Sequence, residues 1–346
     1  MSKIYLDNGY FNAAYVFEHK APIVVIIGGR GTGKTYGILK ELINRNEMFL
    51  HVRRSQTQLD IINKPEFTSF LEINEDTGND ITPFKLNKGS AGYYHTSIND
   101  NGKIIPVGEM LGMTAALSTF ANMRSISLSG VKTIFYDEFI PQAEERKIPH
   151  EGDAVLNMYE TVNRNRELKG QKPVKMILAS NSNTIYSDVL ESLGITNDIE
   201  KMARKGVENR YIEKCGILIL QLYDSEISKA KANTALYHAA NSKEFLAMSV
   251  SNAFYSLGFE NIKPQPLNEY KPLFSIFGIC VYEHKSGGRY YVTNHKSGTF
   301  DEVRSDSVGL SYVRRLYNFL PRFYSAGKVF FESASTVTVF REIWGL

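Results

Sequence analysis

The residues Gly28 to Thr35 carry the most specific chemistry in this sequence, because they read GGRGTGKT. This is the G-x-x-x-x-G-K-[ST] pattern of a phosphate-binding loop, in which backbone N–H groups cradle phosphate oxygens. Lys34 is expected to reach the β- and γ-phosphates of ATP, and Thr35 is expected to hold Mg²⁺. The predicted phosphate-binding residues are Gly28, Gly29, Arg30, Gly31, Thr32, Gly33, Lys34 and Thr35.

A pair of carboxylates, Asp137 and Glu138, follows the apolar run of residues 133–136. Ligands of open α/β sheets bind beside the carboxyl ends of the strands, so we expect this pair to lie next to the phosphate loop. Asp137 would hold Mg²⁺ through a water, and Glu138 would orient and deprotonate the attacking water. The alternative is that the two carboxylates only cap the end of a strand and have no catalytic role. Together with the loop, the pair favours hydrolysis over binding alone.

Two arginines in the segment TVNRNRE, Arg164 and Arg166, are candidates for an arginine finger that reaches the γ-phosphate bound by a neighbouring subunit. Apolar residues at helical spacing predict an amphipathic helix over residues 153–168. At about 100° per residue, Arg166 would lie near the apolar face that contains Val155, and Arg164 would point roughly the opposite way. This geometry favours Arg164 as the finger. The alternative is an arginine in a surface ion pair.

Asn181 follows a predicted strand at residues 174–179. Its side-chain amide is a candidate sensor of the γ-phosphate or of the lytic water, and a helix cap or turn is the alternative. Arg30 in the loop could contact phosphate or a neighbouring subunit, or could simply be exposed. Arg53 and Arg54 end another strand and would face either the site or a subunit interface.

The loop after the carboxylate pair contains Arg146 and Lys147. A basic loop at this position could grip DNA phosphates in the pore of a ring. Three acidic residues in the same loop, Glu144, Glu145 and Glu151, make an ordinary solvated loop equally compatible with the sequence.

The elements that must position these residues alternate between strand and helix patterns. Strands are predicted at residues 22–27, 48–52, 133–136, 174–179 and 216–222. This alternation predicts an α/β fold with a mainly parallel sheet covered by helices, as in P-loop NTPases of the ASCE type. After the Lys-Pro-Gln-Pro segment at 263–266, strands at 273–282, 289–293 and 329–332 alternate with helices and indicate a separate α+β domain.

Composition excludes few classes of function. Hydrophobic residues make up 43% of the 346 residues and charged residues 22%, as in ordinary globular chains. No apolar run approaches the ~20 residues of a membrane span, and Cys215 and Cys280 are expected to be reduced core residues. Residues 201–346 carry 19 Lys and Arg against 13 Asp and Glu, whereas residues 1–200 carry 21 against 24. The basic half is compatible with a polyanionic partner and equally with an ordinary solvated surface.

Five motifs occur in one order, and the set is more specific than any single member. They are GGRGTGKT, FLHVRR, TIFYDEFI, TVNRNRE and LASN. Over residues 1–200 this set resembles the DNA-packaging ATPases of phi29-type tailed phages. The C-terminal part is similar to that family only in its size and in its pattern of elements.

The resemblance implies a homo-oligomeric ring, in this family a pentamer, that drives double-stranded DNA into a preformed procapsid through the capsid portal, in some phages with a structural RNA. It implies a P-loop ATPase domain at residues 1–223, a small helical linker domain at 224–265 and an RNase H-like domain at 266–346. The resemblance also favours Arg164, rather than Arg166, as the arginine finger. The location implied is the host cytoplasm, with transient attachment to the viral procapsid.

Nuclease activity of the C-terminal domain is not expected. RNase H-like nucleases hold metal ions with carboxylates on their first strand. The candidate first strand, residues 273–282, contains none, and the nearest is Glu283. The resemblance likewise implies a domain without a nuclease centre.

Two other classes of function remain compatible with the motifs. A P-loop kinase or small-molecule NTPase would need an acceptor pocket and a lid, and it gives no role to an outward Arg164. A nucleotide-switched nucleic-acid-binding protein would hydrolyse ATP slowly. ATP hydrolysis that rises when double-stranded DNA is added would separate a packaging motor from both.

Overall fold

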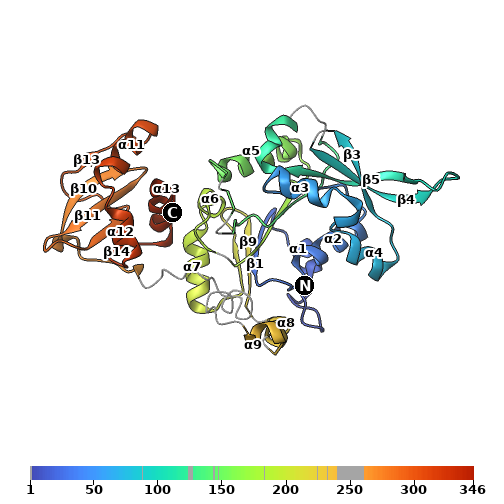
Figure 1. Ribbon diagram of the computed structural model, residues 1–346, viewed down its shortest axis with the longest axis horizontal. Coiled ribbons are helices and arrows are strands. Elements are labelled where there is room, and N and C mark those ends of the chain that lie inside the picture. The colour runs from blue at the N-terminus through green and yellow to red at the C-terminus, as the bar shows by residue number, and fades with distance from the viewer. Residues whose placement is uncertain are drawn as a thin grey trace. The chain divides into compact units, whose positions relative to one another are not determined.

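The computed structural model describes residues 2–87, 89–123, 128–142, 145–146, 148–182, 184–223, 225–231, 233–239 and 261–346. The chain divides into two compact units (Figure 1). The first contains Met1–Asn183 and Met202–Tyr255, and the second contains Thr184–Lys201 and Ser256–Leu346. The predicted linker domain, residues 224–265, lies partly outside the described residues, and the predicted boundaries at 223 and 265 stay predictions.

The sheet of the first unit is mainly parallel, as the alternation predicts. Its strand order among the described residues is β3-β4-β5-β2-β6-β7-β1-β9-β8, and every pair from β5 to β9 is parallel. The strands are β1 (Ile23–Gly28), β2 (Phe49–Arg53), β3 (Thr82–Asn87), β4 (Ser90–Ile98), β5 (Ile104–Ala116), β6 (Thr133–Asp137), β7 (Lys175–Asn181), β8 (Asn209–Ile212) and β9 (Ile217–Leu222). The central strands are almost entirely buried because helices cover both faces, which explains their continuous apolar runs.

Register brings the chemically important strand ends together. Gly28 of β1 pairs with Asn181 of β7, and Asp137 of β6 pairs with Ala179 of β7. These residues lie at the carboxyl ends of adjacent parallel strands. The sheet therefore places the phosphate loop, the carboxylate pair and the asparagine at a single edge.

The helices described before residue 240 precede, connect or follow the strands of this sheet along the chain. Those described are α1 (Ala13–Glu18), α2 (Lys34–Asn44), α3 (Gln56–Ile62), α4 (Leu71–Thr77), α5 (Glu151–Asn163), α6 (Asp188–Ser192), α7 (Thr196–Lys205), α8 (Glu226–Lys231) and α9 (Ala235–Ala239). None of the helices in the described ranges is long and apolar enough to cross a membrane.

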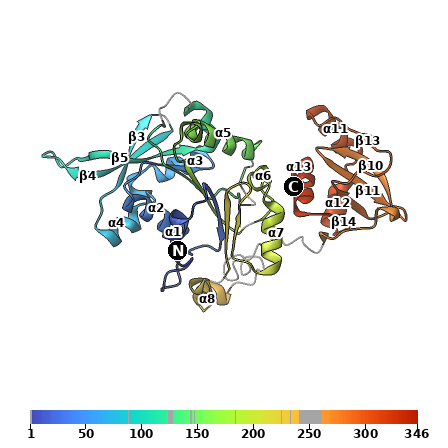
Figure 2. The ribbon, with the colours of Figure 1, turned by 180° about the vertical axis from the view of Figure 1, so that it is seen from behind.

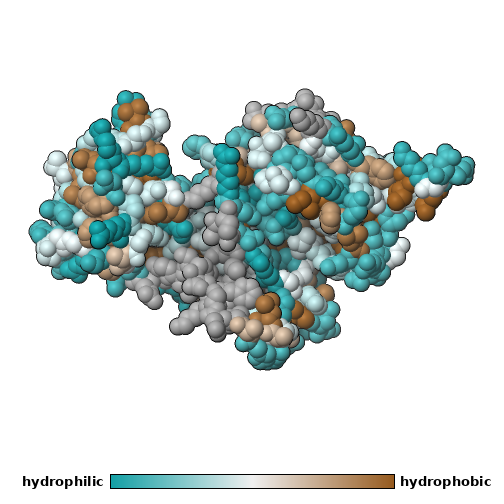
Figure 3. Space-filling model, in the orientation of Figure 1, coloured by the Kyte–Doolittle hydropathy of each residue, from teal (hydrophilic) through white to brown (hydrophobic). Residues whose placement is uncertain are grey.

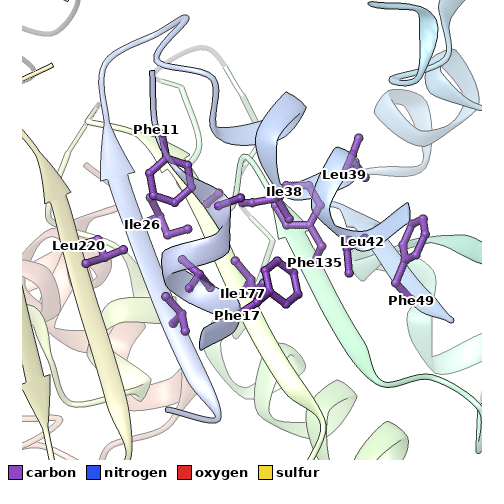
Figure 4. Close-up of a cluster of buried hydrophobic side chains, with 14 of the residues drawn as sticks. Phe11, Phe17, Ile26, Ile38, Leu39, Leu42, Phe49, Phe135, Ile177 and Leu220 are labelled. Atoms are coloured by element: carbon purple, nitrogen blue, oxygen red, sulfur yellow. The ribbon is translucent and has the colours of Figure 1, made fainter. Parts of the chain in front are cut away.

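Helix α2 is fixed to the sheet by apolar side chains at helical spacing. Ile38 and Leu42 are fully buried and gather with Phe135 of β6 and Phe49 of β2 (Figure 4). Truncating such a residue to alanine costs roughly 2–5 kcal/mol. This packing holds the first turn of α2, which begins at Lys34, in a fixed position relative to β6.

The outer half of the β4–β5 hairpin leaves the sheet. It projects beyond the other strands in both ribbon views (Figure 1 and Figure 2). Ile98 and Ile104 near its tip are 74% and 50% exposed, and this arm carries hydrophobic surface (Figure 3). Only the inner end of β5 is buried, so the arm contributes little to the core.

The second unit has a sheet of order β13-β10-β11-β12-β14 within the described residues. Its elements are β10 (Tyr270–Ile276), β11 (Ile279–His284), β12 (Tyr290–Thr293), β13 (Asp301–Glu302), β14 (Val329–Phe331), α11 (Ser307–Leu316), α12 (Leu320–Ser325) and α13 (Ala334–Trp344). Strands β10 to β12 form an antiparallel meander, and β13 and β14 join its two sides in parallel. The unit also includes residues 184–201, to which Ser335 is joined by two hydrogen bonds: its hydroxyl donates to Glu191 of α6, and its amide donates to Asn197 of α7 at 3.2 Å. The predicted class, a P-loop α/β domain followed by a smaller α+β domain, is confirmed.

Two local predictions are wrong. Residues 273–282 do not form one strand, because Phe277 and Gly278 take left-handed conformations (φ 48° and 76°) and turn the chain between β10 and β11. Cys215 is exposed in the turn before β9 instead of lying in the core, whereas Cys280 is buried as predicted.

Candidate active site

The phosphate loop has the shape that its glycines predict. It connects β1 to α2, and Gly31 and Gly33 both take left-handed conformations (φ 67° and 85°), which side chains disfavour. Gly33 is the N-cap of α2. The loop thus directs backbone N–H groups and the positive end of the helix dipole at the same space, which suits a phosphate group.

Lys34 is buried at the base of this loop. Its Nζ donates to the carbonyls of Gly28 (3.0 Å) and Gly29 (2.7 Å) and lies 3.4 Å from Asn181 Oδ1. Burial lowers the pKa of Lys34 to about 7, and Asp137 partly opposes the shift. A phosphate would supply an anionic partner that favours the charged form of the lysine. The side chain therefore lies at the base of the loop, and its reach to the phosphates stays a prediction.

Thr35 and Asp137 form the candidate Mg²⁺ site. The Thr35 hydroxyl donates to Asp137 Oδ1 at 3.0 Å and Oδ2 at 3.1 Å. Burial raises the pKa of Asp137, although the neighbouring Arg53 charge opposes the shift. A hydroxyl beside a single carboxylate is an all-oxygen donor set that fits Mg²⁺, which takes few protein ligands and completes its shell with phosphate oxygens and water.

Glu138 follows β6 in a strained conformation. Its φ of 56° lies in the left-handed region, which costs of order 1–3 kcal/mol for a residue that is not glycine. Its carboxylate pairs with Arg53 and is 37% exposed, whereas the Asp137 side chain is 5% exposed. The two consecutive carboxylates therefore differ in exposure: Asp137 is buried beside Thr35, and Glu138 is more open to solvent, while both line the same cavity.

Arg53 bridges both carboxylates. It ends β2, the strand beside β6, and its Nη1 lies 2.8 Å from Asp137 Oδ2 while Nη2 donates to Glu138. Burial opposes the charge on Arg53, but Asp137 and Glu138 outweigh it and raise the pKa of the guanidinium. The sequence left open whether Arg53 faces the site or an interface. The available signal was its place at the carboxyl end of a strand, where ligands of such sheets bind.

Arg54 forms a buried ion cluster instead of facing a surface. It is 2% exposed and makes two hydrogen bonds of 2.8 Å to Glu151, the first residue of α5. Glu151 also accepts from the Tyr136 hydroxyl at 2.7 Å, and Arg54 donates to Glu145 at 2.6 Å. The cluster anchors α5 to the residue that precedes Asp137. Removing a single partner would cost about 3–5 kcal/mol.

The two arginine-finger candidates have different surroundings. Helix α5 ends at Asn163, and the predicted helix of residues 153–168 is wrong beyond that point because Arg164 and Asn165 are left-handed (φ 45° and 57°). Arg166 is buried and donates to the carbonyls of Ser129 and Val131, both at 2.7 Å. Arg164 is exposed. As predicted, Arg166 is buried and Arg164 is exposed. The cause is that α5 ends at Asn163, whereas the prediction assumed that the helix continued through both arginines.

The remaining candidates lie around the cavity or in the following loop. Arg30 donates to Gln142 at 2.9 Å, which links the phosphate loop to the segment after Glu138. Arg146 is exposed, and its carbonyl lies 3.5 Å from Arg54. Lys147 lies outside the described residues.

Several of the candidate site residues line a cavity of about 1030 Å³. It is large enough for a nucleotide. Its walls include Tyr10, Asn12, Lys34, Asp137, Glu138 and Asn181. Tyr10 was not singled out from the sequence, although its ring lies within 3.1 Å of a Cβ placed on Gly33.

A phosphate loop whose threonine meets a buried carboxylate, on a mainly parallel sheet, places this protein among the P-loop nucleotide hydrolases. Residues 6–277 match the family of the Podovirus DNA encapsidation protein (Gp16), and the chain belongs to this family. The match spans the phosphate loop, both carboxylates, Arg164 and Asn181.

Individual relatives agree with the family. The DNA packaging protein of Bacillus phage PZA is 25% identical over 301 residues, which cover 84% of this chain and 80% of that protein. The DNA packaging protein of Bacillus phage phi29 is 25% identical over 251 residues, which cover 71% of this chain and 66% of that protein.

Two solved structures share the fold along nearly the whole chain. One is described as the Phi-28 gp11 DNA packaging motor, with a TM-score of 0.61, 18% identity and coverage of 98% of this chain and 99% of that one. The other is the bacteriophage Phi-29 viral genome packaging motor assembly, with a TM-score of 0.63, 18% identity and coverage of 97% and 98%.

Proposed function

We propose that this protein is an ATP-driven motor that moves double-stranded viral DNA into a preformed procapsid. The observation that carries the proposal is the hydrogen bond between Thr35 and Asp137 beside the phosphate loop, in a chain of the DNA encapsidation family. The hydroxyl and carboxylate are already within reach of one metal ion. The family membership supports DNA as the transported polymer.

ATP and Mg²⁺ would be bound by the phosphate loop, Lys34, Thr35 and Asp137, whose side chains contact one another or the loop in the structure. Loop N–H groups and Lys34 would take the phosphates, and Thr35 and Asp137 would hold Mg²⁺, which neutralises phosphate charge when bound. Lys34 would exchange its carbonyl partners for phosphate oxygens. Both lysine and loop are placed before the nucleotide arrives, so little reorganisation is needed.

Hydrolysis would require Glu138 to leave Arg53. The glutamate would then accept a proton from the water that attacks the γ-phosphate. Its strained backbone and its partial exposure support a side chain that changes partners between two states. Asn181, at the end of the strand beside β6, would report on the γ-phosphate or the water.

Arg164 would act on the nucleotide of a neighbouring subunit. It is exposed just beyond the end of α5, and a planar guanidinium suits the charge that develops on the transferred phosphoryl group. Such a role requires a ring of identical subunits, for which we propose a pentamer. The buried Arg166 is left with a structural role.

The partners that follow are double-stranded DNA, the capsid portal and, in some phages, a structural RNA between the motor and the portal. Arg146 and Lys147 are candidates for the grip on DNA phosphates. The motor would act in the host cytoplasm while attached to the procapsid.

We also propose that the C-terminal domain does not cut DNA. Glu283, on β11, forms an ion pair with Lys271 at 2.8 Å and lies 3.4 Å from the Tyr290 hydroxyl, contacts that occupy it structurally. Within the described ranges no group of three or more His, Cys, Asp or Glu could hold a metal ion. Nicking of plasmid DNA by the full chain in the presence of Mn²⁺ would contradict this proposal. The nicking activity would have to copurify with the protein, so that a contaminating nuclease is excluded.

ATP hydrolysis measured with and without double-stranded DNA tests the function. A packaging motor should hydrolyse ATP faster when DNA or empty procapsids are added. A small-molecule kinase or NTPase would ignore both additions. A nucleotide-switched nucleic-acid-binding protein would hydrolyse ATP slowly, and DNA would not accelerate it.

A further inference from the structure

Helix α8 lies against an N-terminal turn that lines the nucleotide cavity. The hydroxyl of Ser225, just before the helix, donates to the Gly9 carbonyl at 3.2 Å, and this contact is buried. A Cβ added at Gly9 would come within 2.9 Å of Glu226 Cβ, so glycine is required for the close approach of the helix. From this turn the cavity is lined by Leu6, Asn8 and Tyr10.

Lys231 ends α8 and reaches the phosphate loop. Its Nζ donates to the carbonyl of Arg30, and a Cβ added at Gly31 would overlap the same ammonium group. The preceding carbonyl of the loop, that of Gly29, accepts a hydrogen bond from Lys34 Nζ at 2.7 Å. Two lysines from distant parts of the chain therefore contact consecutive carbonyls of one loop.

The charge of Lys231 acts on Lys34. Burial is the main cause of the lowered pKa of Lys34, and the charge of Lys231 adds to that effect. Burial also lowers the pKa of Lys231. Two ammonium groups that converge on an anion-binding loop are both stabilised when an anion lies between them.

We propose that Lys231 is a second cationic ligand of the nucleotide phosphates, supplied by α8 of the same subunit. This inference rests on the ATP site proposed above. In this motif the lysine at the position of Lys34 reaches the β- and γ-phosphates. Because Lys231 contacts the neighbouring carbonyl of the loop, it contacts the same phosphates. The ammonium then exchanges the Arg30 carbonyl for a phosphate oxygen and draws α8 onto the loop.

Binding of ATP, ADP and AMP to single variants tests this role. Lys231→Gln should weaken the binding of Mg²⁺-ATP about tenfold, because a charge-assisted hydrogen bond is lost, and should change AMP binding less than about twofold. Lys231→Arg keeps the charge and should retain ATP affinity within about threefold. Lys229→Gln, an exposed position on the same helix, is the matched control and should bind all three like wild type.

Wild-type ATP affinity in Lys231→Gln would overturn the inference. So would an equal loss for ATP and AMP together with a lower melting temperature without nucleotide, because that pattern marks a lysine that only holds α8 in place. If wild type itself fails to bind ATP, the proposed function fails instead.

Chemical labelling of the unmodified protein gives a second test that does not depend on a variant. Acetylation of Lys231 by a lysine-reactive ester, measured by peptide mass spectrometry, should fall when Mg²⁺-ATP is added, whereas acetylation of Lys229 should not. Labelling of Lys231 that is unchanged by saturating ATP would contradict the proposal.

Discussion

The Thr35 hydroxyl lies 3.0 Å from Asp137 Oδ1, and this hydrogen bond joins the first turn of α2 to the end of β6. The two residues are far apart in the chain, and the packing of Ile38 and Leu42 beneath them fixes their separation. A metal ion bound by both would therefore need little rearrangement of the backbone. The site is organised before its ligand binds, which is the arrangement that favours catalysis by preorganised charge.

Glu138→Gln should keep ATP binding but lower the rate of hydrolysis by about 10²-fold or more, because the amide cannot accept a proton from water. Binding of ATP and turnover should be measured on the same preparation. Glu160→Gln changes an exposed glutamate on α5 and serves as the control. Undiminished hydrolysis in Glu138→Gln would remove this residue as the base.

Arg164→Ala should be rescued in mixed rings. Combining it with Glu138→Gln subunits creates some interfaces in which an intact Arg164 faces an intact Glu138, so the mixture should hydrolyse more ATP than either variant alone. The measurement is ATPase activity as a function of mixing ratio, with ring assembly confirmed by light scattering. A mixture no more active than its components would show that Arg164 does not act in trans.

Arg166→Ala provides the contrast. It leaves the carbonyls of Ser129 and Val131 without the guanidinium, and unsatisfied buried groups cost about 1–3 kcal/mol each. We expect a lower melting temperature and no rescue by mixing. A rescue equal to that of Arg164→Ala would transfer the finger role to Arg166.

The positions of the candidate site residues could be predicted from sequence because motif and strand pattern specify them together. Gly28 to Thr35 and Asp137 lie at strand ends, and parallel strands bring such ends to one edge. The contacts of Arg53 could not be predicted, because they depend on the order of strands in the sheet. Nothing in a strand pattern states that β2 lies beside β6.

The local errors have a different cause. Helix α5 ends at two left-handed residues, Arg164 and Asn165, where neither glycine nor proline marks the end. The turn at Phe277 and Gly278 lies inside a continuous apolar run that reads as one strand. At the end of α5 the burial of Arg166 accompanies the left-handed residues. At the second turn Gly278 was the overlooked signal, because glycine adopts left-handed conformations readily.

His51 should make the first unit sensitive to acid. It is fully buried, stacked 5.3 Å from the Phe135 ring centroid, and burial followed by the charge of Arg53 lowers its pKa to about 3. The unfolded chain takes up a proton near pH 6.5, whereas the folded chain does not. Stability is therefore present above pH 6.5 and is lost as the pH falls toward 3.

The variant His51→Phe isolates this effect. The His51 Nδ1 lies 3.2 Å from the Tyr93 hydroxyl, and the His51 Nε2 finds no hydrogen-bond partner within the part of the chain described. Phenylalanine keeps an aromatic side chain that cannot titrate, so loss of the Tyr93 contact affects stability at every pH and only the pH dependence reports on His51. Between pH 6.5 and 4.5 wild type should lose stability relative to the variant by up to roughly 1.4 kcal/mol per pH unit. Parallel loss in both proteins, measured by urea unfolding, would contradict the assignment.

DNA binding should depend steeply on salt and little on base sequence, because a motor must pass every sequence of its genome. The logarithm of affinity should fall by about 0.9 per neutralised phosphate for each tenfold rise in salt. Binding to two unrelated duplexes should be titrated with a slowly hydrolysed ATP analogue and with ADP. We expect tighter binding with the analogue, and a flat salt slope or a strong preference for one duplex would argue against a motor.

The central claim is that ATP hydrolysis at Glu138 moves DNA into a procapsid. The most direct measurement is the amount of linear double-stranded DNA that becomes resistant to nuclease when procapsids, this protein, Mg²⁺ and ATP are combined. The account predicts full-length protected DNA with wild type, and none with Glu138→Gln or with a non-hydrolysable ATP analogue. Protection that is equal with and without hydrolysis, or ATP turnover without any protected DNA in procapsids of the same phage, would contradict it.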